Sequence, residues 1–388
     1  MLEERGGALI VAVAVLALSI GLILYHFAGY YLLLKVLILF RNDRVAKHPD
    51  NKEFPLISVI VTAHNEERTI RRKIENTLSL DYPSDRFEVI LADDWSEDGT
   101  VNAVNDFILE GRIRYFKPDK HMGKTYAQNG AVREANGDII AFSDANSYWE
   151  TDVLRRFAKS FQDTSVGFVA GALRYTGINE TPTSQSRGLY WNYELKLRSL
   201  ESIFLSIVTS NGAIYAIKRN LYCDADPLYS HDSFMPPYIV SLGRKAVFDS
   251  SIVANEKIVK DVSKEYSRRV RIFGRMYKFL FDKTLWRMLR ETESTYRLMF
   301  FSHRILRLLL PMLSLLSIAT LISIMILYSP IHVFLIFLIF ASVPILTISK
   351  IRNVFFHYSL TIVAMTIGFY NYITGKIKPY WEPVDDGR

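Results

Sequence analysis

The chain has 388 residues, and its 47 lysines and arginines against 40 aspartates and glutamates give a formal net charge of +7. Its single cysteine, Cys223, excludes a disulfide framework and any metal site built from several cysteines. The basic residues gather beside long apolar segments rather than in one polar stripe, so we expect membrane lipids and no nucleic acid among its partners.

Three segments without a formal charge predict a multi-pass protein of the cell membrane: 6–34, 308–349 and 354–375. Each is long enough to cross a hydrocarbon core, which takes roughly 20 residues. The first is too long for a signal peptide and lacks a small-residue cleavage site after a short core, so it reads as a retained anchor. Six basic residues border the apolar segments and predict a cytoplasmic central domain: Arg41, Arg44, Lys47, Arg297, Arg304 and Arg307.

The central part of the chain alternates apolar strands with helices. The run 56–62 predicts a strand buried on both faces, and 66–80 a helix that ends before Pro83. The next expected elements are a strand at 87–92, a helix to about 109, strands at 112–116 and 138–143, and a helix at 124–135 between them. This alternation predicts an α/β domain with a mainly parallel sheet.

The pattern loosens after Tyr175, where we expect a helix at 184–204, a strand at 211–217 and a helix at 232–242. A basic amphipathic helix at 264–290 is then expected to lie on the membrane surface rather than to bind a partner helix. We therefore divide the chain into an N-terminal anchor (1–44), the α/β domain (45–262), interfacial helices (263–306), about three C-terminal membrane helices (307–375) and a tail (376–388).

Polar residues follow three of the expected strands, and parallel strands bind ligands at their carboxyl ends. Asp144 and Asn146 follow one strand, two residues apart, and offer the oxygen ligands that Mg²⁺ and Mn²⁺ prefer. The other interpretation of this pair is a side-chain-capped loop. Asp93 and Asp94 end another strand, where one carboxylate is free to bind a ligand and the other to cap the following helix.

Cations and a base complete the candidate site. Lys124 begins a helix, where backbone amides favour an anion such as diphosphate, unless it is a solvated surface lysine. Asp232 lies at a helix N-terminus and is either a general base or an N-cap. Arg268, Arg269 and Arg271 either clamp a leaving diphosphate or face lipid headgroups.

These motifs together resemble the family 2 glycosyltransferases, the inverting enzymes that include cellulose, hyaluronan and chitin synthases. The resemblance runs from about 55 to 275 and is closest to the exopolysaccharide branch. Its pieces, in order, are 59–66 (VIVTAHNE), 93–99 (DDWSEDG), 121–124 (HMGK), 144–146 (DAN) and 210–219 (SNGAIYAIKR). It implies a GT-A fold, a Rossmann-like α/β domain, and a role in polysaccharide biosynthesis.

The resemblance also implies roles for individual residues. Donor binding falls to Thr62, Ala63, His64, Glu66, Asp93, Asp94, Lys124, Asp144, Arg268 and Arg271. Asp144 and Asn146 would hold Mn²⁺ or Mg²⁺ with the diphosphate, and Asp232 would be the catalytic base. The acceptor path would be lined by Trp191, Glu194, Asn211 and Gly212.

The chain departs from the family pattern at four positions. Asn146 replaces the second acid of Asp-x-Asp, which weakens metal binding by one charge, and His231 replaces the acid before the base. Arg268 and Ile272 replace the Gln and Trp of Gln-x-x-Arg-Trp, so the aromatic platform for a growing chain is missing and processivity is in doubt. The tail 381–388 resembles that of hyaluronan-synthase relatives. Counting one N-terminal and three C-terminal spans nevertheless puts it outside the cytoplasm, unless 354–375 is re-entrant.

We therefore expect a membrane-bound glycosyltransferase that inverts the anomeric centre. Its donor would be a nucleotide-diphosphate sugar, with UDP implied by the family, and its acceptor a hydroxyl of a lipid-linked sugar or a polysaccharide. The alternative is a nucleotide-sugar sensor or scaffold subunit without catalysis. A transporter is disfavoured, because the apolar segments carry few ionisable residues: His26, Lys35 and His357.

Overall fold

The computed structural model describes residues 2–40, 54–177, 182–257, 262–328 and 349–380. Within this part of the chain, eight strands form one sheet in the order β3-β2-β1-β4-β7-β6-β8-β5. The strands are β1 Ile57–Ala63, β2 Phe87–Asp93, β3 Arg114–Phe116, β4 Ile139–Asp144, β5 Tyr148–Trp149, β6 Val166–Thr176, β7 Ile214–Lys218 and β8 Lys245–Lys257. Every residue of β1 is buried, as its apolar run predicts for a central strand.

The sheet is mixed but mainly parallel, as expected: four of its strand pairings are parallel and three are antiparallel. Strands β1, β2, β3 and β4 pair in parallel, as the strand–helix alternation predicts. Strand β7 then enters antiparallel between β4 and β6, and β5 pairs antiparallel with β8. Strands β6 and β8 again pair in parallel, so the antiparallel exceptions are the pairings of β7 and β5, which the strand–helix alternation did not predict.

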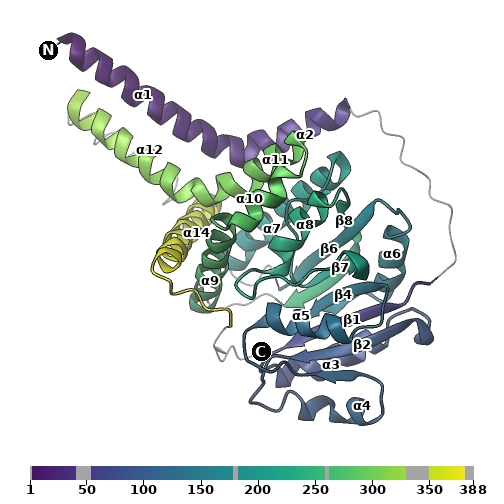
Figure 1. The fold of residues 1–388 in the computed structure, drawn as a ribbon. Helices are drawn as coiled ribbons and strands as arrows, with labels where there is room; N and C mark the ends of the chain where they lie inside the picture. The colour runs from purple at the N-terminus through teal and green to yellow at the C-terminus, as the bar shows by residue number, and fades with distance from the viewer. Residues whose placement is uncertain (1, 41–53, 178–181, 258–261, 329–348, 381–388) are drawn as a thin grey trace.

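Helices cover both faces of the sheet and make a three-layered domain (Figure 1). One face packs against α3 (Glu67–Leu78), α4 (Asn105–Leu109) and α6 (Val153–Ser160) through an apolar core that includes Ile70 and Phe157. The other packs against α5 (Lys124–Glu134), α7 (Pro182–Phe204) and α8 (His231–Ser241), whose buried residues include Leu197 and Met235. The carboxyl ends of β1, β2 and β4 remain open between these layers.

Two long apolar helical segments lie side by side and extend away from the α/β domain (Figure 1). One comprises α1 (Leu2–Leu24), the π-helical turn η1 (Tyr25–Gly29) and α2 (Tyr30–Leu39). The other comprises α11 (Ser294–Phe300), the π-helical turn η5 (Phe301–Ile305) and α12 (Leu306–Tyr328). By length and hydropathy, the stretches Gly6–Leu39 and Ser294–Ile326 are candidate membrane spans among the described residues.

The last described helix, α14 (Ser349–Ile373), packs along α9 (Val262–Leu280). Gly274 and Gly368 face each other at this contact, and a Cβ on Gly368 would meet the backbone nitrogen of Gly274 at 2.9 Å. The absence of side chains there lets the two helices approach closely. Residues 329–348, which belong to the expected apolar segment 308–349, lie outside the described residues.

The expected basic helix at 264–290 is two helices, α9 and α10 (Lys283–Arg290). The break is at Asp282, whose side chain accepts a hydrogen bond from Thr284 N at 2.9 Å and caps α10. An N-cap aspartate satisfies a backbone amide that a continuous helix would not leave free, so it starts a new helix here. The apolar spacing alone did not reveal this cap.

Candidate active site

A pocket of about 750 Å³ runs from the carboxyl ends of β1, β2 and β4 to the apolar helices α12 and α14. At the sheet, Thr62 of β1 lies opposite Ala92 of β2 and Asp144 of β4 in the strand register. The polar residues that follow these strands therefore converge at one edge, as the sequence predicts. Nearly all the expected site residues line the pocket, with the exceptions of Asp93 and Glu194.

Neighbouring aspartates at the end of β2 have different surroundings. Asp93 accepts hydrogen bonds from Ser96 N and Tyr115 OH, both at 3.0 Å, and closes the turn after the strand. Both Asp94 carboxylate oxygens are buried without a hydrogen-bond partner among the described residues, and so is the Thr62 hydroxyl. Burial raises the pKa of Asp94. Buried polar atoms left unpaired are costly, so Asp94 and Thr62 mark a place for ligand atoms, whereas Asp93 holds the loop.

Aromatic rings stack beside Asp94. The rings of His64 and His121 are stacked with centroids 4.7 Å apart, and His121 also contacts Tyr380 at 4.8 Å. His121 Nδ1 lies 3.2 Å from Asp94 Oδ2, and His64 Nδ1 lies 2.7 Å from the Asp94 carbonyl oxygen. Flat rings beside an unpaired carboxylate suit a planar ligand with N–H donors, such as a nucleobase.

The C-terminal segment reaches this end of the pocket. Pro379 and Tyr380 line it, and a Cβ on Gly123 would collide with the Pro379 carbonyl oxygen. Gly123 also has φ = +85°, a conformation that only glycine adopts readily. The chain therefore returns to the sheet domain after α14, at Pro379 and Tyr380. Residues 381–388 lie outside the described residues.

Lys124 and Asp144 form an ion pair in the middle of the pocket. Lys124 Nζ also donates to the Gly212 carbonyl oxygen at 3.0 Å, which joins the start of α5 to the loop before β7. Asn146, half-buried, lines the pocket two residues beyond Asp144. One carboxylate and one amide oxygen fit a hard divalent cation that takes its remaining ligands from phosphate and water.

Histidine and aspartate side chains also gather in a second place. In the described residues, His64, Asp94 and His121 have potential ligand atoms within 4.8 Å of one another. Two members of this set, His64 and His121, are the stacked rings themselves, and the set does not include Asp144 or Asn146. The cation site expected from the sequence, at Asp144 and Asn146, is a different place in the same pocket.

Asp232 lies in the first turn of α8 and lines the pocket. Its backbone carbonyl accepts a hydrogen bond from Ser210 N at 2.9 Å, which fixes the start of the helix. Within the described residues its carboxylate makes neither a hydrogen bond nor an ion pair, although Arg275 and Arg304 are near enough to interact with it electrostatically. A half-buried carboxylate with free lone pairs in a cleft is suited to accept a proton.

His231 has a structural role beside that carboxylate. Its Nδ1 lies 3.0 Å from Tyr215 OH and its Nε2 lies 3.1 Å from Asn129 Oδ1. Burial, followed by the charges of Lys124 and Arg275, lowers the pKa of His231 to about 3. The residue that replaces the acid of the family motif is therefore a neutral ring that joins α8 to α5 and β7.

Arginines of α9 form one wall of the pocket. Arg268 pairs with Glu265 at 3.2 Å, while burial and the charges of Arg275 and Arg268 lower the pKa of Arg271 to about 10. Arg275 donates to three backbone carbonyls of the loop before α8: those of Pro227, Leu228 and Tyr229. Arg275 thus fixes the loop that precedes Asp232, and Arg268 and Arg271 line the pocket.

The expected acceptor residues divide into two groups. Trp191, Asn211 and Gly212 line the pocket, although the Asn211 side chain is held by Gly171 O at 2.9 Å and by the amides of Ala213 and Ile214. Glu194 does not line it. Its carboxylate is buried and paired with His303 and Arg307, behind side chains such as Arg307 that do line the pocket.

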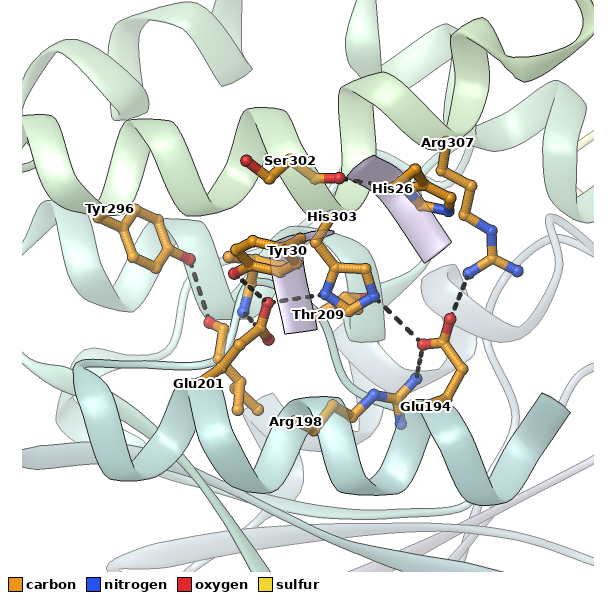
Figure 2. Close-up of polar contacts among 12 residues, drawn as sticks. His26, Tyr30, Glu194, Arg198, Glu201, Thr209, Tyr296, Ser302, His303 and Arg307 are labelled. Carbon is orange, nitrogen blue, oxygen red and sulfur yellow. Dashed lines mark hydrogen bonds and ion pairs between the residues drawn. The ribbon is translucent and has the colours of Figure 1, made fainter. Parts of the chain in front are cut away.

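A buried ionic network connects α7 with the two apolar segments (Figure 2). His303 lies between Glu201, at 2.8 Å from Nδ1, and Glu194, at 3.2 Å from Nε2. Tyr30 donates to Glu201 at 2.9 Å, and Arg307 donates to Glu194 at 3.1 Å. From the sequence, Arg304 and Arg307 appeared only as orientation signals. Charged residues at the helical spacing 194, 198 and 201 within an apolar pattern were the available sign of a buried charged face.

The chain was compared with known proteins. Residues 58–222 match the family model described as "Glycosyl transferase family 2". The chain is 31% identical over 180 residues to the probable glycosyltransferase YdaM of Bacillus subtilis, covering 44% of this chain and 42% of YdaM. It is 38% identical over 145 residues to the UDP-Glc:alpha-D-GlcNAc-diphosphoundecaprenol beta-1,3-glucosyltransferase WfaP of Escherichia coli, covering 36% of this chain and 56% of WfaP. The matches thus span about half the length of these relatives.

Among solved structures, the mannosyltransferase PcManGT from Pyrobaculum calidifontis, in complex with GDP-Man and Mn²⁺, has the same fold. The superposition has a TM-score of 0.72 at 22% identity and covers 93% of this chain and 99% of that chain. Sheet order and pocket therefore define an α/β protein of the GT-A type. Within that class, residues 58–222 resemble glycosyltransferase family 2.

Proposed function

We propose that this protein is a membrane-anchored glycosyltransferase. It moves a sugar from a nucleotide-diphosphate donor, with UDP as the first candidate nucleotide, to a hydroxyl group of an acceptor that enters from the membrane side. The observation that carries the proposal is the continuous pocket. Its sheet end has the unpaired atoms of Thr62 and Asp94, its middle has Lys124 and Asp144, and Asp232 lies between these and the apolar helices.

The donor binds at the sheet end in this proposal. Asp94 accepts hydrogen bonds from the nucleoside, and the Thr62 hydroxyl donates one to it. His64 and His121 pack against its flat base. Lys124 exchanges its bond with Asp144 for the diphosphate, which also faces Arg268 and Arg271. Asp144 and Asn146 would hold a Mn²⁺ or Mg²⁺ ion, which would supply positive charge beside the leaving diphosphate.

Asp232 is the general base. Its carboxylate takes the proton of the acceptor hydroxyl while that oxygen attacks the anomeric carbon from the face opposite the diphosphate. The bond between the anomeric carbon and the diphosphate oxygen breaks, the nucleoside diphosphate leaves with both electrons, and the configuration inverts. Lys124, Arg268 and Arg271 stabilise the charge that develops on the diphosphate, and a single contact of this kind contributes roughly 10²–10³ in rate.

We propose further that the stretches Gly6–Leu39 and Ser294–Ile326 cross the membrane, with the α/β domain on the cytoplasmic side of a multi-pass protein. Support comes from side chains such as Ile10, 71% exposed, and Leu315, 60% exposed, which an aqueous surface would not favour. The basic residues beside these stretches agree with this orientation.

The acceptor in this proposal is a lipid-linked sugar rather than a long polysaccharide. WfaP, by its name, acts on a sugar linked to diphosphoundecaprenol. Ile272 lines the pocket at the position where the processive relatives have tryptophan, so an aromatic platform for a growing chain is absent at that position. Addition of one or a few sugars fits this pocket better than processive synthesis of the cellulose and hyaluronan type.

The test measures nucleoside diphosphate release by the purified protein with a panel of UDP- and GDP-sugars and Mn²⁺ or Mg²⁺. Metal-dependent release from one donor, lost in Asp232→Asn, is the expected result and names the sugar. Donor binding without release, even with lipid-linked acceptors present, would favour the nucleotide-sugar sensor or scaffold. A protein that binds no nucleotide would exclude the glycosyltransferase proposal.

A further inference from the structure

Arg198 of α7 is a buried cation whose hydrogen-bonding capacity is largely unused. Its relative exposure is 4%, and its Nε and Nη1 have no hydrogen-bond partner among the described residues. Nη2 lies 3.8 Å from Glu194 Oε2, which is too long for a hydrogen bond, and the Trp191 ring covers one face of the guanidinium at 5.1 Å. Buried arginines are almost always hydrogen-bonded as well as paired, so beside this long ion pair with Glu194 the Nε and Nη1 donors lack an acceptor.

The surrounding network has no acceptor left for it. Glu194 accepts from His303, Arg307 and Tyr190. Glu201 accepts from Tyr30, His303 and the backbone amide of Val208. Figure 2 shows Arg198 beside Glu194, below the cluster around His303. Both glutamates are thus used by other donors, and the missing partner of Arg198 has to come from outside the network.

The pocket provides the route for that partner. Arg198, Arg304 and Arg307 all line it, and Arg304 Nη2 donates to Ser233 Oγ at 2.9 Å, directly after Asp232. Beyond the arginines, the candidate spans and α14 contribute the apolar side chains Phe27, Leu310, Ile362 and Met365, together with His26, Tyr358 and Thr361. An anion at Arg198 would therefore lie between the proposed base and the part of the pocket that the membrane-span helices line.

We propose that Arg198, with Arg304 and Arg307, forms a subsite for the phosphate or diphosphate group of the lipid acceptor, with the hydrocarbon chain leaving past Phe27 and Leu310. Guanidinium groups bind phosphate oxygens with strong charge-assisted hydrogen bonds, and the unpaired nitrogens of Arg198 supply two donors. This subsite is separate from the donor diphosphate site at Lys124 and Asp144. The inference rests on the proposed function and specifies its acceptor as a phosphate-linked lipid.

The test measures binding of four probes to the full-length protein in nanodiscs: farnesyl diphosphate, farnesyl phosphate, farnesol and inorganic diphosphate. Saturating nucleoside diphosphate with Mn²⁺ occupies the donor site throughout. Farnesyl diphosphate should bind at least about tenfold more tightly than farnesol or inorganic diphosphate. Arg198→Gln should remove about tenfold or more of that affinity, as the loss of charge-assisted hydrogen bonds predicts, and leave farnesol unchanged.

Two further variants serve as controls. Arg287→Gln removes an exposed arginine of α10 outside the pocket and should change nothing, which excludes a general loss of surface charge. Arg198→Lys keeps the buried charge but loses the planar fork, so it should fold, bind nucleotide normally and lose several-fold in farnesyl diphosphate affinity. If Arg198→Gln does not fold, as shown by lost nucleotide binding, Arg198→Lys decides the test.

The outcomes separate the two proposals. Equal binding of inorganic and farnesyl diphosphate would indicate a soluble anion and overturn the lipid assignment, as would affinity independent of residue 198. If the wild-type protein binds no nucleotide but binds farnesyl diphosphate through Arg198, the glycosyltransferase proposal fails while the anion subsite stands. If nucleotide binds and the prenyl diphosphate does not, the subsite alone is overturned.

Discussion

The sheet end of the pocket and the buried network on α7 both concentrate polar groups, but they satisfy them differently. At the sheet end, Thr62 and Asp94 are buried with hydrogen-bonding atoms unused. In the network, Glu194 and Glu201 accept hydrogen bonds from several elements of the chain. Since an unpaired buried group costs free energy that only a ligand recovers, the first region is built to bind and the second to hold the protein together.

The difference also applies between adjacent residues. Asp93 and Asp94 have the same side chain and are both buried, yet Asp93 is hydrogen-bonded to its own loop and Asp94 faces the pocket. Arg198 is the exception within the network, because it has the unused donors typical of the binding region. The comparison therefore predicts which substitutions change ligand binding and which change stability.

The largest effect is expected for Asp232→Asn. The amide cannot accept the hydroxyl proton, so turnover should fall by about 10³-fold while the donor dissociation constant stays within about twofold. Nucleoside diphosphate release and nucleotide binding measured on the same preparation check this. Asp85→Asn, an exposed carboxylate outside the pocket, is the matched control and should be fully active. Near-normal turnover by the Asp232 variant would remove this residue from the mechanism.

Glu201→Gln tests the structural region. The glutamine N–H₂ group would face the hydrogen-bond donors of Tyr30, His303 and Val208. The free energy of unfolding should therefore fall by about 3 kcal/mol. Thermal unfolding in detergent measures the change, and the folded fraction should keep its donor affinity. Glu110→Gln, on the exposed surface, should change stability by less than about 0.5 kcal/mol. Lost donor affinity with unchanged stability would reverse the assignment of this region.

Asp94→Asn and Asp93→Asn sharpen the comparison between neighbours. Asp94→Asn should weaken donor binding by about tenfold or more, with little loss of stability, because the contact with His121 at 3.2 Å is the one close charge contact that the buried carboxylate has among the described residues. Asp93→Asn should instead cost about 1–2 kcal/mol of stability through the bonds to Ser96 and Tyr115, with donor affinity nearly unchanged. Calorimetric nucleotide binding and thermal unfolding of both variants check the pair. The same response from both would contradict the division.

The smallest effect concerns pH and His231. Burial lowers its pKa to about 3, so the unfolded chain binds a proton that the folded protein does not as the pH falls below about 6.5. The stability contributed by the neutral ring is complete above pH 6.5 and is lost on acidification, by about 1 kcal/mol between pH 6.5 and 5.5. His231→Gln should remove this part of the slope in thermal unfolding measured from pH 5 to 7.5. Parallel pH profiles for the two proteins would show that His231 does not titrate on unfolding.

The sequence predicts the N-terminal half of the domain well, because each element there has a local signal. The apolar runs of β1, β2 and β4 and the polar residues that follow them lie close to their expected positions. Strand β8 was missed, since its 13 residues include the polar stretch Asp249–Ser251. The register of β6 against β8 shifts at this stretch, which interrupts the alternation that marks a strand.

The candidate site was predictable where residues follow strands and not where distant helices meet. Asp144 lines the pocket as expected, since the parallel topology brings the strand ends together, and Lys124 and Asp232 line it from the first turns of α5 and α8. Glu194 was expected in the acceptor path, but its partners His303 and Arg307 are more than 100 positions away along the chain. A local pattern gives the face of a helix and does not say which other helix covers that face.

The contact between Gly123 and Pro379 has a consequence for how this chain can be shortened. The segment after α14 is part of the wall beside His121 and the proposed nucleobase site, rather than a loose end. A truncation at the end of α14 would leave every residue of the α/β domain in place and still open one side of the donor pocket. The boundary of the functional unit therefore lies beyond the last helix.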